Sequence, residues 1–166
     1  MIAALLSLLL AVAAPAASVH DGRHDFDFEI GTWRMAPSGN LHVVRKLWDG
    51  ATIGQLVVLH PAREVRGSLL SLYVPASDTW NVYWADARDG SLSPPLSGRF
   101  RNGVGTFEGR DAAGGRAVLV RLVISKIRAS SFQTDQSVSK NGGATWGDHN
   151  VQTYARVGPL GVSPAH

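Results

Sequence analysis

The chain has 166 residues, the length of one domain, and its 45% hydrophobic residues are enough to build a single closed core. It contains no cysteine, which excludes disulfide cross-links and cysteine-based metal sites. The formal charge of +3 comes from scattered Lys and Arg residues without a basic run, so we expect no nucleic-acid partner.

Residues 1–18 have the pattern of a cleaved signal peptide. An uncharged run rich in Leu, Ala and Val extends from Ile2 to Ala17 and ends in small residues. The run is too short to span a membrane, and the exact cleavage site stays open. We therefore expect a bacterial periplasmic or secreted protein with no stable membrane span after cleavage. Residues 19–157 are then the folded domain and residues 158–166 a flexible tail.

The rest of the chain is a succession of short strand signals. Phe26-Asp27-Phe28-Glu29-Ile30 alternates apolar and polar residues, which is the period of a half-buried strand, so the first strand is expected to run from here to near Met35. Turn signals such as Asp49-Gly50 and Asn102-Gly103 separate the segments that follow. Further strands are predicted at 41–48, 53–59, 65–74, 79–85, 96–101, 104–110, 117–125, 131–138 and 146–157.

Turns at intervals of about eight to twelve residues favour a β-sandwich or barrel over an α/β fold. No stretch after residue 18 shows the apolar period of a helix. Closing the sheet on itself removes exposed strand edges, and short hairpin turns favour neighbours in chain order. We predict an all-β fold with a single antiparallel up-and-down β-barrel of about ten short strands.

Gly31-Thr32-Trp33 near the start of the first strand resembles the opening of a lipocalin-type barrel. In such barrels the indole fills the closed end and an arginine from the last strand lies across it. Arg156, in the last predicted strand, matches that arginine. The resemblance therefore implies that Trp33 and Arg156 close the base of the barrel.

The segment from Ser139 to Trp146 matches an Asp-box, Ser-x-Asp-x-Gly-x-Thr-Trp, with Asn141 in the Asp position. The side-chain oxygens of this motif bind the backbone of their own loop, and the tryptophan packs beneath it. A single copy favours a structural hairpin over a functional site.

Four residues are candidates for ligand contacts: Trp84, Arg121, Gln136 and Tyr154. Trp84 and Gln136 belong to strands that combine aromatic and polar side chains, which is typical of small-ligand pockets and also of barrel cores. Arg121 lies within an apolar strand, where it either reaches solvent, pairs with an acid or orients an anionic ligand. These alternatives stay open.

Catalytic and metal signals are sparse. The six histidines show no metal-site spacing, and no nucleophile elbow or phosphate loop is present, so we predict neither a metal nor a cofactor. Glu108 and Asp135 are candidate acids or bases if they are buried beside Arg121, and His149 follows Asp148. Exposed charge on the outer face of a strand explains all of them equally well.

A wider resemblance rests on residues 25–33, 44–50 and 89–95 together with the Gly-Gly-x-Thr-Trp hairpin. With these motifs, nearly the whole mature chain resembles a family of exported bacterial calycin-like proteins of unknown function. The resemblance implies a lipocalin-like barrel with a cavity and carries over no ligand or reaction. The chain departs from that pattern at residues 36–40, where its first connection is short.

The favoured hypothesis is an exported barrel that binds a small, partly apolar molecule, with an anionic head as one option. The alternatives are a calycin-type enzyme with a buried acid and arginine, and a module that binds another macromolecule through an apolar outer patch. We expect binding rather than catalysis, and the sequence does not define the oligomeric state.

Overall fold

The computed structural model describes residues 20–57, 67–113 and 115–158. The predicted signal peptide, and the predicted tail apart from Gly158, lie outside the described residues, as do the ends of two predicted strands at 58–59 and 65–66.

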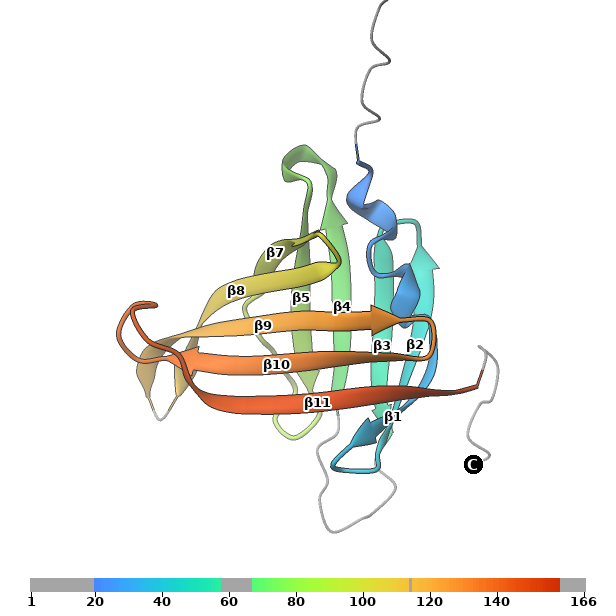
Figure 1. Ribbon diagram of the computed structural model, residues 1–166. Helices are drawn as coiled ribbons and strands as arrows, with labels where there is room; N and C mark the ends of the chain where they lie inside the picture. The colour runs from blue at the N-terminus through green and yellow to red at the C-terminus, as the bar shows by residue number, and fades with distance from the viewer. Residues whose placement is uncertain (1–19, 58–66, 114, 159–166) are drawn as a thin grey trace, which may run out of the picture.

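Ten strands of the described chain close into a ring (Figure 1). Each is antiparallel to the next in sequence, β5 pairs with both β4 and β7, and β11 returns to β1. A two-residue strand, β6 (Ser91–Leu92), pairs only with the end of β5. The predicted all-β, up-and-down barrel is therefore confirmed. The ring consists of β1 (Gly31–Ala36), β2 (Leu41–Trp48), β3 (Ala51–Val57), β4 (Gly67–Val74), β5 (Thr79–Asp86), β7 (Leu96–Arg101), β8 (Val104–Ala113), β9 (Arg116–Arg128), β10 (Ser131–Ser139) and β11 (Gly147–Gly158).

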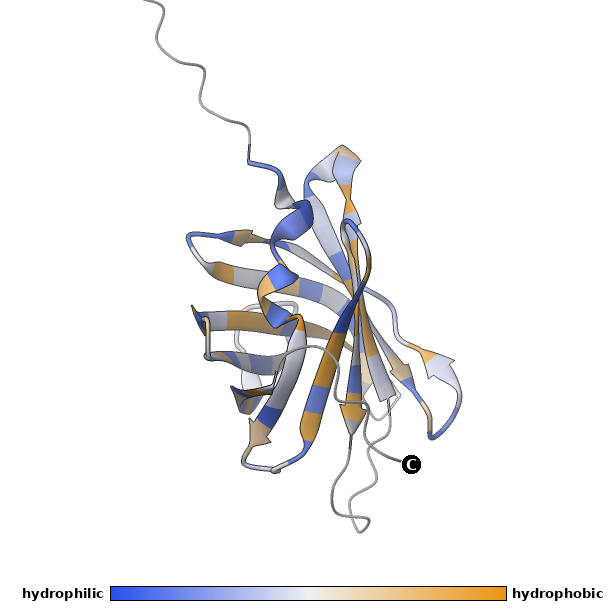
Figure 2. Ribbon diagram, turned by 90° about the vertical axis from the view of Figure 1, so that its right-hand side faces the viewer, coloured by the Kyte–Doolittle hydropathy of each residue, from blue (hydrophilic) through white to orange (hydrophobic). Residues whose placement is uncertain are grey.

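Hydrophobic and hydrophilic residues alternate along the strands (Figure 2). Because successive side chains of a strand point to opposite faces, this alternation decides which of them face the interior. On β9, Val118, Val120 and Ile124 are buried, and Arg121 between them contacts groups on the outside. The hairpin between β7 and β8 turns at Asn102 and Gly103, which both have positive φ, 51° and 75°. This is the turn geometry that matches the twist of paired strands, and the Asn-Gly sequence provides it.

The segment from Phe26 to Ile30 is not a strand, and this prediction was wrong. It forms the short 3-10 turn η2 (Asp27–Glu29), which follows an earlier one, η1 (Gly22–His24). Neither edge of the adjoining strand β1 is free for it, because β1 already pairs with β2 on one side and β11 on the other. With about three residues per turn, Phe26 and Glu29 lie on the same side, facing the barrel interior.

The N-terminal turns cross one end of the barrel and close it (Figure 1). On one side, the Trp80 indole on β5 donates a hydrogen bond to the Gly22 carbonyl at 2.9 Å. On the other side, Arg156 on β11 donates to the carbonyls of Phe28 and Ile30 at 2.9 and 2.8 Å. The segment is therefore anchored to opposite walls.

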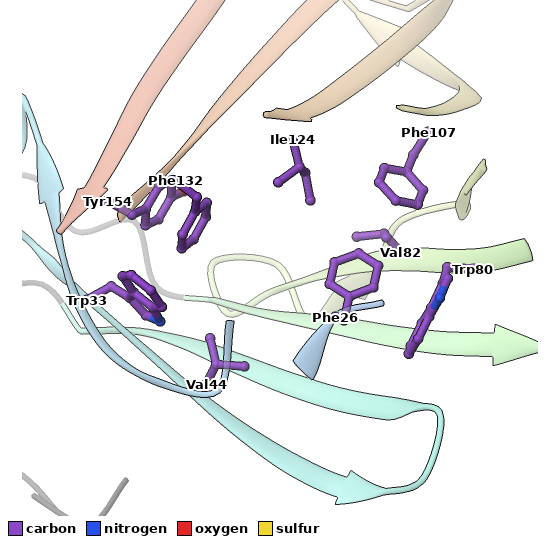
Figure 3. Close-up of a cluster of buried hydrophobic side chains, with 9 residues drawn as sticks. All are labelled: Phe26, Trp33, Val44, Trp80, Val82, Phe107, Ile124, Phe132 and Tyr154. Carbon is purple, nitrogen blue, oxygen red and sulfur yellow. The ribbon is translucent and has the colours of Figure 1, made fainter. Parts of the chain in front are cut away.

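Aromatic side chains fill the closed end (Figure 3). Phe26, only 1% exposed, packs edge-on against Trp80 with ring centroids 4.7 Å apart. The rings of Phe132 and Tyr154 stack with centroids 4.2 Å apart, and Trp33 and Phe132 form a T-shaped pair with centroids 4.8 Å apart. Such pairs add stability beyond the area they bury.

Arg156 lies over the Trp33 ring, with its guanidinium carbon 4.0 Å from the ring centroid. The contact between these two residues is therefore present, as the sequence predicts. Besides the two carbonyls of the N-terminal segment, Arg156 binds the Ala129 carbonyl in the β9–β10 turn at 2.8 Å. One side chain thus joins β1, β11, the β9–β10 turn and the N-terminal segment.

The Asp-box forms the predicted hairpin between β10 and β11. The Ser139 hydroxyl accepts a bond from the Gly143 amide at 2.8 Å, and the Asn141 side-chain oxygen accepts one from the Thr145 amide at 2.9 Å. Trp146 then packs under the Arg121 guanidinium on the outer face, 3.7 Å from the ring centroid. The asparagine performs the capping role of the usual aspartate.

Replacing Arg156 should weaken the closed end. Arg156→Met removes three hydrogen bonds and a cation–π contact, so the free energy of unfolding should fall by roughly 3 kcal/mol. Arg156→Lys keeps a cation but not three directed donors, and its loss should be smaller. Arg110→Met, at an exposed position on β8, is the matched control. Urea denaturation measures the unfolding free energy of all three variants. Equal stability of Arg156→Met and the control would show that Arg156 does not stabilise the closed end.

Candidate functional site

The barrel interior contains a cavity of about 460 Å³, within the size range of small-molecule sites. Its walls combine apolar and aromatic side chains with a few polar groups. They comprise Phe26, Glu29, Met35, Ser38, Asn40, His42, Leu56, Leu69, Ser71, Val82, Tyr83, Trp84, Ser93, Pro94, Leu96, Asp111, Val120, Leu122, Ile124, Phe132, Thr134, Gln136, Asn150, Gln152 and Tyr154.

The burial of these residues distinguishes a floor from a mouth. Buried side chains, among them Phe26, Phe132 and Tyr154, form the floor above the closed end. Exposed residues of the wall surround the opening at the opposite end: Ser38, Pro94, Asp111, Gln136 and Asn150. The short connection at residues 36–40 contributes Ser38 and Asn40 to this rim.

Glu29 is the acidic group of the floor. Its side of η2 faces the cavity, and the residue is only 8% exposed. Burial raises the pKa of its carboxyl to about 8, so the group is protonated at neutral pH. This carboxyl group forms no hydrogen bond or ion pair with a described residue.

The backbone of Glu29 is held firmly although its carboxyl is not. The Trp33 indole donates a 2.6 Å hydrogen bond to the Glu29 carbonyl. Arg156 binds the carbonyls on either side, at Phe28 and Ile30. Consequently the groups that close the barrel also fix the position of the acid.

His42 on β2 adds a neutral imidazole to the floor. It is 5% exposed, and burial lowers its pKa to about 4, so the ring is uncharged at pH 7. The ring meets Tyr154 edge-on, with centroids 5.7 Å apart. Its position requires glycine at residue 54, because a Cβ there would collide with the imidazole.

Tyr154 and Gln152 extend the polar floor along β11. Burial raises the pKa of the Tyr154 hydroxyl to about 12, opposed by a hydrogen bond with Thr134 on β10. Gln152 has a buried side-chain oxygen without a hydrogen-bond partner among the described residues. The floor therefore offers several polar groups, all uncharged at neutral pH, beneath apolar walls.

Three of the four predicted contact residues line the cavity: Trp84, Gln136 and Tyr154. Their contact with a ligand stays a prediction. Arg121 is elsewhere, because it alternates with the inward residues of β9. It forms an ion pair with Glu108 at 2.7 Å on the outer face and covers Trp146.

The proposed acid–arginine arrangement for catalysis is not found inside the barrel. Glu108 pairs with Arg121 outside, and the Asp135 carboxylate lies 2.9 Å from Nδ1 of His149, both partly exposed. Asp148 pairs instead with Lys140. In the described part of the chain, no group of three His, Asp or Glu side chains has the arrangement of a metal site.

Glu29 and His42 are the floor residues that the sequence patterns did not reveal. Glu29 was missed because its segment has the alternating pattern of a strand. A signal for His42 was available, since Trp33 and His42 are equally distant from the turn near Pro37 and pair across it. An inward Trp33 therefore implies an inward His42.

Comparisons with known proteins add nothing to this geometry: neither a scan against family models nor a search of curated proteins found a match to the chain. Within residues 20–57, 67–113 and 115–158, no helix has the length and hydropathy needed to cross a membrane.

The two buried titratable groups predict a distinctive pH dependence of stability. Folding raises the pKa of Glu29 to about 8. Its contribution to the unfolding free energy is therefore complete below about pH 4.5 and is lost as the pH rises to about 8. His42 acts in the opposite sense, and its contribution is lost as the pH falls from about 6.5 to about 4. Between pH 4.5 and 6.5 the effects of Glu29 and His42 on the unfolding free energy offset each other. Above pH 6.5 the effect of Glu29 alone remains, and it lowers stability as the pH rises.

We expect the unfolding free energy to fall by roughly 2 kcal/mol between pH 6.5 and 8 and Glu29→Gln to abolish this fall. Glu108→Gln, which removes an exposed carboxylate, should leave the pH profile unchanged. Urea denaturation across this pH range measures the three proteins. A Glu29→Gln profile parallel to that of the unmodified chain would show that Glu29 is not the group responsible.

Proposed function

We propose that this barrel binds a small, partly apolar molecule in its interior. The observation that carries the proposal is the 460 Å³ cavity itself, with apolar walls, a polar floor and a rim of exposed residues at one end. Burial of apolar ligand surface in such a preformed space supplies affinity, and a few polar groups at its end supply orientation.

An anionic head group is not favoured by this geometry. That option depended on Arg121, whose guanidinium is engaged by Glu108 and Trp146 on the outer face. The basic group at the floor is His42, and it is neutral at pH 7 because burial lowers its pKa to about 4. A carboxylate placed at the floor would therefore lose its hydration without gaining a counter-ion.

The outer surface supports a macromolecular partner less well. Several large apolar side chains are exposed, Trp48 most of all at 62%, with Leu47 beside it in the β2–β3 hairpin. The others lie on β6, β8 and β11, so they are spread around the molecule. An extended interface would need them gathered into one patch.

The cellular setting is part of the proposal. An uncharged apolar leader of the length typical of secretory signals supports export to the periplasm or medium. Membership of the calycin-like exported family is supported by the sequence motifs together with the lipocalin-like barrel.

The test is a binding assay with N-phenyl-1-naphthylamine, a neutral probe whose fluorescence rises in apolar surroundings. We expect saturable binding that Leu122→Trp, which fills the cavity from β9, reduces at least tenfold. Val123→Trp, the outward-facing neighbour on the same strand, should bind as the unmodified protein does. Equal binding by both variants, or the absence of binding to the unmodified protein, would contradict a ligand site in the barrel interior.

A further inference from the structure

The charges of the chain are distributed unevenly between the cavity and the outer surface. The protein has 16 Lys and Arg residues against 13 Asp and Glu, yet among the described residues no Lys or Arg lines the cavity. Two acidic side chains do: Glu29 at the floor and Asp111 at the mouth. Three basic side chains instead line a hollow outside the closed end: Arg101, Lys126 and Arg128.

The floor acid is also left without a partner. Glu29 is more than nine-tenths buried, lines the cavity, and has no hydrogen-bond or ion-pair partner among the described residues. A buried carboxyl group is stable only when it is neutral or when a cation or donor satisfies it. The described part of the chain supplies no such group at this position.

Aromatic rings surround the same space. Phe26, Phe132 and Tyr154 line the floor, and Trp84 lines the wall on β5. Aromatic faces attract cations, most strongly where water is excluded. An enclosed carboxyl together with aromatic faces is therefore suited to a positively charged organic group.

We propose that the cavity binds an organic monocation, a protonated amine carried on an apolar or aromatic body, with the ammonium group against the Glu29 carboxylate. This inference rests on the proposed function and names the chemical class of its ligand. Asp111 at the rim adds an attractive charge along the path of entry.

Binding of a cation at Glu29 is coupled to release of a proton. At neutral pH the empty site holds the neutral acid, because burial raises the pKa of Glu29 to about 8. The ammonium pairs with the carboxylate, so the acid's proton passes to solvent and the net charge of the floor stays zero. Affinity should therefore rise about tenfold per pH unit below pH 8.

The other titratable groups near Glu29 do not produce this slope. Across the floor, His42 on β2 is neutral and Tyr154 on β11 stays protonated over this range. Asp111 and Tyr83 line other parts of the wall, on β8 and β5. Arg156 faces the backbone of η2, where it binds the carbonyls beside Glu29.

Isothermal titration calorimetry with three probes of similar shape and different charge tests the inference. The probes are 2-phenylethylamine, 2-phenylethanol and 3-phenylpropionate. At pH 8 the amine should bind at least tenfold more tightly than the alcohol, and the carboxylate should bind most weakly. Between pH 6 and 7 the amine affinity should rise about tenfold and the alcohol affinity should not change. The trimethylammonium analogue of the amine, which has no proton to lose, should show the same slope.

Glu29→Gln should abolish both the preference for the amine and its pH slope while the alcohol still binds. Glu108→Gln on the outer face is the matched control and should keep both. Circular dichroism confirms that each variant is folded, and the pH profile of the unmodified protein tests the inference without any variant.

The outcomes separate the two levels of the proposal. If N-phenyl-1-naphthylamine and the alcohol bind but the amine has no advantage, or if the carboxylate binds most tightly, the amine inference is refuted and the proposed function stands. If none of the probes binds, the proposed function fails with it.

Discussion

The bracket formed by Arg156 and Trp33 holds the rest of the structure in place. Together these two side chains bind three consecutive backbone carbonyls, those of Phe28, Glu29 and Ile30. The cation–π contact between them adds to the strength of the bracket. The same contacts therefore close the barrel and position its acidic floor group. The geometry of the cavity depends on contacts made just beneath it.

Much of this architecture was predictable because it depends on local patterns. Strands β2 and β7 have the predicted bounds, since apolar alternation ends where turn residues such as Asp49-Gly50 begin. The contact between Trp33 and Arg156 and the Asp-box hairpin were also predictable, because each is a fixed set of residue types at fixed positions. Period, turn chemistry and motif each act over a few residues.

The site was harder to predict because it depends on whether each side chain points into the barrel or outward. Phe26 and Phe28 have the spacing of a strand, but both edges of the adjoining strand β1 are already paired, and the segment crosses the barrel end instead. Arg121 sits in an apolar strand, yet it faces outward. A one-residue change of register reverses such an assignment. Whether a residue faces inward or outward is fixed only when the ring of strands closes, and this closure depends on pairings between distant parts of the chain.

The acid at the floor is better explained by a ligand than by the fold. The turn that buries Phe26 in the aromatic core also directs Glu29 to the cavity, so an apolar residue at position 29 would complete the same core. A neutral amide would avoid the desolvation that raises the pKa of this carboxyl to about 8. The fold gains nothing visible from the charge, because the bracket binds only the backbone there. A buried acid in a cavity whose described wall contains no Lys or Arg is therefore complementary to a cation from outside this part of the chain.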